Sequence, residues 1–110
     1  LVAAQGGDLL GCGAMRRMPG EPETAGQPYG EIKRMYVRPE QRGQRLAEQI
    51  LRTLEARLLA GGIALALLET GRDQTEAVRL YQRRGYQTRG PFGGYDDNGL
   101  SLFLEKRLVP

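Results

Sequence analysis

One stretch of the sequence, residues 30–51, has the pattern of a strand, a tight basic turn and the start of an amphipathic helix. The run Glu31–Val37 is rich in strand-forming residues, and Pro39 ends it because proline has no N–H to give to a sheet ladder. From Arg45 onward apolar residues recur at helical spacing, and polar residues such as Glu55 fill the other face. We therefore expect one helix to begin where the turn ends.

A turn of this kind is suited to bind a phosphate group. The first N–H groups of a helix have no internal partner, and the helix dipole places about half a positive charge at that end. Arg42 and Arg45 add full charges, and Gly43 lets the backbone approach an anion closely because it has no Cβ. A basic helix cap without any ligand is the structural alternative.

Two motifs resemble the signatures of one protein family. The segment Arg42-Gly-Gln-Arg-Leu-Ala47 resembles the Arg/Gln-x-x-Gly-x-Gly/Ala pyrophosphate loop of the GNAT superfamily of acetyl-CoA-dependent N-acyltransferases, with Arg45 in the place of the middle glycine. The segment Gln74-Thr-Glu-Ala-Val-Arg-Leu-Tyr-Gln-Arg-Arg-Gly-Tyr86 resembles the second signature, Asn-x-x-Ala-x-x-Leu-Tyr-x-x-x-Gly-Phe. The resemblance covers residues 1–108, and the end of the chain is most similar to small bacterial acetyltransferases.

The resemblance implies that acetyl-CoA is the co-substrate. The strand backbone would pair with the pantetheine arm, the turn would hold the pyrophosphate, and Gln74 would reach the pantetheine or its phosphate, with an amide cap of the helix as the alternative. The side chain of Arg45 either crowds the cofactor or contacts a phosphate. The cofactor-binding residues implied are Met35, Tyr36, Val37, Arg42, Gly43, Gln44, Arg45, Leu46, Ala47, Gln74 and Tyr81.

Acetyl transfer to an amine requires a deprotonated nitrogen, a polarised thioester carbonyl and a protonated leaving thiolate. In the family, the tyrosine at the place of Tyr81 acts as the general acid; a core tyrosine is the alternative. Glu31 matches by position the carboxylate that some members use as general base, and a solvated carboxylate paired with Lys33 or Arg34 is an equal alternative. The Met35 N–H would donate to the thioester oxygen.

The remaining elements follow from turn residues and periodicity. Residues 1–15 predict a hairpin, and residues 63–68 predict a strand that is apolar on both faces and therefore covered on both sides. A second helix follows the turn over residues 71–75 and ends at Gly85, and residues 86–89 and 100–105 predict two further strands. The fold class is therefore α/β (mixed α+β), an acyl-CoA N-acyltransferase-like mixed sheet with helices on both faces.

The resemblance places the loop over residues 91–99 near the acceptor site. This loop contains Phe92, Tyr95, Asp96 and Asp97, and a carboxylate there could receive an ammonium group. Aspartates beside glycines more commonly form turns, so we favour a simple turn for Asp96 and Asp97.

Composition limits the possible chemistry. The 110 residues form a single domain, residues 1–110, with a net charge of +3. One cysteine and no histidine exclude an internal disulfide, a zinc site and a histidine-activated nucleophile. Acidic and basic residues alternate along the helices, so a basic nucleic-acid-binding domain is a less favoured alternative.

The chain starts at Leu1, without the strand and two helices that precede this point in the family, so we interpret the domain as N-terminally short. The strand edge left exposed would favour a homodimer. Neither a membrane span nor a signal peptide is visible, which predicts a cytoplasmic protein. We expect an N-acetyltransferase that moves acetyl from acetyl-CoA directly to a primary amine; an acyl-CoA-binding module without turnover is the alternative.

Overall fold

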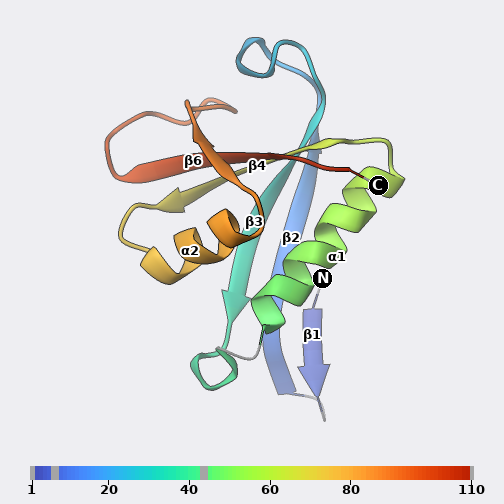
Figure 1. Cartoon of the computed structure of the whole chain (residues 1–110), viewed down its shortest axis with the longest axis vertical. Helices are drawn as coiled ribbons and strands as arrows, with labels where there is room; N and C mark the ends of the chain where they lie inside the picture. The colour runs from blue at the N-terminus through green and yellow to red at the C-terminus, as the bar shows by residue number, and fades with distance from the viewer. Residues whose placement is uncertain (1, 6–7, 43–44, 110) are drawn as a thin grey trace.

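The computed structural model describes residues 2–5, 8–42 and 45–109, which form one mixed β-sheet with two α-helices (Figure 1). The strand order is β1-β2-β3-β4-β6-β5, and among the described strands only β3 and β4 are parallel neighbours. The predicted order of elements along the chain is confirmed. The strands are β1 (Val2–Gln5), β2 (Asp8–Met18), β3 (Tyr29–Val37), β4 (Leu65–Gly71), β5 (Gln87–Arg89) and β6 (Ser101–Arg107); the α-helices are α1 (Leu46–Ala60) and α2 (Thr75–Arg83); two 3₁₀ turns are η1 (Pro22–Thr24) and η2 (Pro39–Gln41).

Helix α1 packs one apolar face closely on the sheet. A Cβ added to Gly30 of β3 would lie 2.3 Å from the Cδ2 atom of Leu58, so the close approach of helix and strand requires glycine. The helix ends before Gly62, whose φ of 82° is left-handed and suits glycine. No helix in the described part of the chain is long and apolar enough to cross a membrane. The buried residues of the apolar face are Ile50, Leu51, Leu54 and Leu58.

Both helices lie on the same face of the sheet, which is turned toward the viewer in Figure 1. Leu54 of α1 and Tyr81 of α2 belong to one buried cluster, together with Leu68 of β4. On the other face, Leu67 packs with Phe92 from the loop over residues 91–99. The predicted mixed α/β fold is thus confirmed, but within the described residues a loop, not a helix, covers the second face.

One side chain expected on the polar face of α1 is buried. Glu55 is 8% exposed; it accepts a hydrogen bond from the Tyr86 hydroxyl at 2.8 Å and pairs with Lys106 at 3.0 Å. Burial beside this carboxylate raises the pKa of Tyr86 well above its ordinary value. Helical spacing alone predicted that Glu55 is exposed. This prediction was wrong because the partners of Glu55 come from distant parts of the chain, which helical spacing does not indicate.

Strands β3 and β4 separate after a short paired stretch. Their paired residues are Gly30 with Ala66, Glu31 with Leu67 and Ile32 with Leu68, although both strands continue further. Beyond Ile32, β3 pairs only with β2 among the described strands. Figure 1 shows the two strands diverging, with α2 in the angle between them.

A β-bulge in β3 lies where the two strands separate. The register with β2 shifts by one residue between the Cys12–Tyr36 and Ala14–Lys33 pairs, and Arg34 has a left-handed φ of 56°. The extra residue changes the alternation of side chains. Ile32 and Met35 therefore both pack into the cluster under the helices, although they are three positions apart.

Candidate functional site

A groove of about 1090 Å³ lies between the end of β3, the start of α1 and one side of α2. It opens where β3 leaves β4, so the backbone edge of β3 beyond Ile32 borders it. Gly43 and Gln44, also predicted to bind the cofactor, lie outside the described residues. The structure brings together in this groove the predicted residues Met35, Tyr36, Val37, Arg42, Arg45, Leu46, Ala47, Gln74 and Tyr81.

The N-terminus of α1 reaches this groove without a side-chain cap. Arg45 occupies the N-cap position and makes no capping hydrogen bond, so its side chain does not satisfy the first N–H groups of the helix. Arg45 has a φ of 62°, a left-handed conformation that favours glycine. Arg42 donates a hydrogen bond from Nε to the Val37 carbonyl at 3.1 Å. Two guanidinium groups and the N-terminus of the helix thus make this end of the groove suitable for an anion.

Tyr81 lies at the boundary between the groove and the core. Its side chain is 6% exposed, its ring packs edge-on against Tyr86 at 5.7 Å between centroids, and it also lines the groove. Burial raises the pKa of Tyr81 to about 12, so the hydroxyl is protonated at neutral pH. The hydroxyl makes no hydrogen bond to another described residue. Tyr81 is therefore a core residue that also borders the groove, and its hydroxyl carries a proton at neutral pH.

Gln74 lies at the N-cap of α2 and lines the groove. Its side chain makes no capping hydrogen bond and is exposed. The alternative of an amide cap is therefore not realised, and the amide is free to contact a ligand.

Glu31 does not line the groove, because strand alternation directs its side chain to the second face of the sheet. Glu31 is 4% exposed, and its carboxylate accepts a hydrogen bond from the Tyr95 hydroxyl and lies 3.9 Å from the Lys33 ammonium group. The alternative of a solvated carboxylate is thus wrong, although the pairing with Lys33 is present. Asp96 and Asp97 are exposed in the loop that carries Tyr95.

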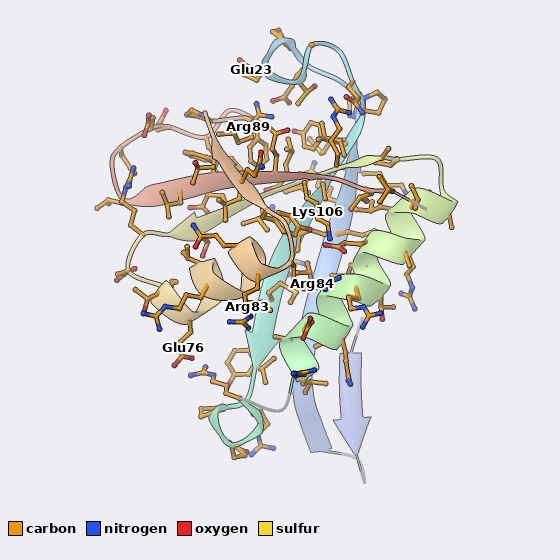
Figure 2. All side chains as sticks on the ribbon, viewed as in Figure 1. Glu23, Glu76, Arg83, Arg84, Arg89 and Lys106 are labelled. Atoms are coloured by element: carbon orange, nitrogen blue, oxygen red, sulfur yellow. The ribbon has the colours of Figure 1, made fainter. Side chains whose placement is uncertain are left out.

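Several groove residues were missed from the sequence. Figure 2 shows Glu76 and Arg83 on the side of α2 that faces the loop after β3. Their spacing in the helix places them on one side, so helical periodicity could have identified this row once the groove was known. The groove residues that were not predicted are Glu48, Glu76, Ala77, Arg79, Leu80 and Arg83.

Within residues 2–5, 8–42 and 45–109, no group of three or more His, Cys, Asp or Glu side chains could hold a metal ion.

Comparisons with known proteins give a consistent result. The sequence model of the acetyltransferase (GNAT) family matches residues 1–86. The IAA acetyltransferase of Azospirillum brasilense is 43% identical over 108 residues, which cover 98% of this chain and 67% of that protein. The chain thus spans about two thirds of that relative's length.

Solved structures show the same fold. A protein described as an acyl-CoA N-acyltransferase of Klebsiella pneumoniae matches with a TM-score of 0.82 at 40% identity, over 96% of this chain and 68% of that chain. The PaiA N-acetyltransferase of Thermoplasma acidophilum, solved in complex with coenzyme A, matches with a TM-score of 0.78 at 19% identity, over 96% of this chain and 58% of that chain.

Proposed function

Because the chain belongs to the acetyltransferase (GNAT) family, whose members transfer acyl groups from coenzyme A, we propose that it moves acetyl from acetyl-CoA directly to a primary amine. Acetyl-CoA is the co-substrate, as in the related folds that contain bound coenzyme A or acetyl-CoA. The acceptor is a small molecule or a peptide.

One observation carries the proposal: the groove joins an edge of β3 that pairs with no other described strand to a helix N-terminus that the Arg45 side chain does not cap. Pantetheine has amide groups that can pair with the backbone of β3 from Met35 to Val37 as an added strand would. The pyrophosphate then lies at the start of α1, beside Arg42 and Arg45, where N–H groups and positive charge favour an anion. The two ends of the groove thus match the two chemical parts of the cofactor.

The catalytic roles follow from the sides of the sheet on which the side chains lie. Tyr81 is on the groove side and protonated at neutral pH, so it can give a proton to the departing thiolate. Glu31 is on the opposite side, beside the opening between β3 and β4, and accepts a proton from the acceptor's ammonium group directly or through water, which leaves the free amine to attack the thioester. The Met35 N–H donates to the thioester oxygen.

A cytoplasmic location and a homodimer are further parts of this proposal. The two edge strands of the described sheet, β1 and β5, have free edges that could pair with a second chain, which supports the homodimer.

The first test is calorimetric titration with coenzyme A and acetyl-CoA, followed by release of the coenzyme A thiol in the presence of an acceptor panel. The panel contains the common amino acids, spermidine, a lysine-containing peptide and IAA, the last because of the name of the Azospirillum relative. We expect micromolar binding of both ligands and thiol release with at least one amine. Binding without any turnover would support the binding module instead.

A matched pair of variants tests the position of the pyrophosphate. Ala47→Glu adds a carboxylate inside the groove in the first turn of α1, whereas Gln49→Glu adds one in the same turn outside the groove. Acidic residues in a first helical turn are compatible with the helix dipole, so both variants should fold. We expect Ala47→Glu to weaken binding at least tenfold by charge repulsion; equal effects of both variants would refute the assignment.

A further inference from the structure

Tyr95 donates a hydrogen bond from its hydroxyl to Oε2 of Glu31 at 2.5 Å. The Lys33 ammonium group lies 3.9 Å from the same oxygen, an ion pair too long for a hydrogen bond, and Oε1 has no hydrogen-bond or ion-pair partner among the described residues. One oxygen of the carboxylate is thus held by the Tyr95 hydroxyl and faces the Lys33 charge, and the other is left to accept a proton.

The Tyr95 ring is fixed by aromatic packing on the second face of the sheet. It packs against Phe92 at 5.5 Å and against Phe103 at 5.9 Å between ring centroids, and its backbone N–H donates to the Phe92 carbonyl at 3.1 Å. Phe92 itself is 1% exposed. The hydroxyl therefore has little freedom to leave Glu31.

A second pair of contacts ties the same loop to the rest of the molecule. Oε1 of Glu21 accepts a hydrogen bond from the Gly93 N–H, and Oε2 of Glu21 accepts one from the Tyr29 hydroxyl at 2.9 Å. Tyr29 also packs edge-on against Phe92 at 5.6 Å. Two tyrosines thus flank Phe92, and each donates its hydroxyl to a different glutamate, although only Tyr95 reaches Glu31.

Other charges surround this hydrogen bond. Burial, with the adjacent Glu31 carboxylate, raises the pKa of Tyr95 to about 12, so the hydroxyl remains a donor throughout the neutral range. Ser101 donates its hydroxyl to the carboxylate of Glu69 on β4. The ionisable groups that face Glu31 or Tyr95 are Arg16 from β2, Tyr29 and Lys33 from β3, and Glu69 from β4.

We propose that Tyr95 is a positioning residue for the reaction: its hydroxyl fixes the Glu31 carboxylate in the orientation that presents Oε1 to the attacking amine. The inference rests on the proposed function, because it requires Glu31 to be the general base.

The test compares Tyr95→Phe with Tyr29→Phe. Both variants keep a ring in the aromatic cluster and remove one hydroxyl that is bonded to a glutamate, so they should cost similar amounts of stability. Only Tyr95→Phe removes a donor to Glu31. The first measurement is a ¹³C NMR titration of the glutamate carboxyl groups, with Glu31→Gln used to assign the Glu31 signal; it requires no acceptor.

The second measurement is the pH profile of thiol release from acetyl-CoA, with the fastest amine of the panel or, if none reacts, with water as acceptor. We expect Tyr95→Phe to change the Glu31 NMR signal and the pH profile of kcat, and to lower kcat about tenfold at neutral pH. The KM for acetyl-CoA should stay unchanged, because Tyr95 does not line the groove. Tyr29→Phe should leave the NMR signal and the pH profile in place.

The outcomes separate the inference from the function on which it rests. If Glu31→Gln retains full activity, the base assignment fails and the positioning role fails with it. If Glu31→Gln is inactive but Tyr95→Phe has the unchanged NMR titration and pH profile, only the role of Tyr95 is refuted. Equal changes of the NMR signal and of the pH profile in Tyr95→Phe and Tyr29→Phe would also refute the positioning role of Tyr95, because they would show a general loosening of the loop.

Discussion

Replacement of Arg45 by glycine should make the protein more stable while weakening its affinity for acetyl-CoA. Arg45 has a φ of 62° at the N-cap of α1, and the left-handed conformation costs a residue with a Cβ about 1–2 kcal/mol. Glycine removes this cost. However, glycine has more conformational freedom in the unfolded chain, which lowers the stability of the fold by about 0.5–1 kcal/mol. The net expectation for Arg45→Gly is a gain of about 0.5–1 kcal/mol in the free energy of unfolding.

The same substitution removes a positive charge from the groove. Arg45 is exposed, so its contact with a phosphate would be screened by solvent, and we assign it about 1 kcal/mol. That energy corresponds to a roughly fivefold loss of affinity. Thermal unfolding without ligand should show a midpoint higher by roughly 4 °C, and calorimetric titration should show the weaker binding of acetyl-CoA.

Arg34→Gly is the matched control. Arg34 is also exposed and left-handed, with a φ of 56°, but it lies in the β3 bulge and does not line the groove. It should therefore show the gain in stability without the loss of affinity. The strain argument is refuted if Arg45→Gly lowers or leaves unchanged the unfolding midpoint. An equal loss of affinity in both variants would mean that net charge matters, not contact with the phosphate.

Three further predictions concern Tyr81 and the core. Tyr81→Phe should lower kcat by about tenfold to a thousandfold with little change in acetyl-CoA affinity, and an unaltered rate would remove Tyr81 from the mechanism. Because burial raises the pKa of Tyr81 from 10.0 to about 12, its neutral form stabilises the fold below pH 10, and this contribution is lost as the pH rises through 12. Urea unfolding at pH 9 and pH 11 should thus show a smaller loss of stability in Tyr81→Phe than in the wild type. Glu55→Ala should cost about 2–4 kcal/mol in urea unfolding because it leaves the buried Tyr86 hydroxyl and the half-buried Lys106 ammonium group without their acceptor, whereas Glu40→Ala, in an exposed ion pair, should cost less than about 1 kcal/mol.

The sequence predicted the order of elements and most of the groove because these depend on local patterns. Pro39 ends a strand, Gly62 ends a helix, and helical spacing identifies the buried face of α1. The loop motif also identified Arg45 as the place of a glycine, which agrees with its left-handed backbone. Such signals lie within a few residues of the feature they predict.

What the sequence did not predict depends on contacts between distant residues. Glu55 reads as a solvent-facing helical residue, and only its two partners on other elements explain its burial. The bulge at Arg34 has no local signal, since the run from Glu31 to Val37 looks like a regular strand. The hydrogen bond between Tyr95 and Glu31 joins residues 64 positions apart, so no periodicity could indicate it.

The bulge and the separation of β3 from β4 together explain how β3 places side chains of the proposed site on both faces of the sheet. Before the bulge, Glu31 points to the second face and Ile32 to the helix face; without the extra residue, Met35 would also point to the second face. With it, Met35 and Val37 line the groove on the side of Tyr81, while Glu31 stays beside Tyr95. An acid on one face and a base on the other can meet a single reacting centre only where the sheet is open, and β3 and β4 leave it open immediately after Ile32.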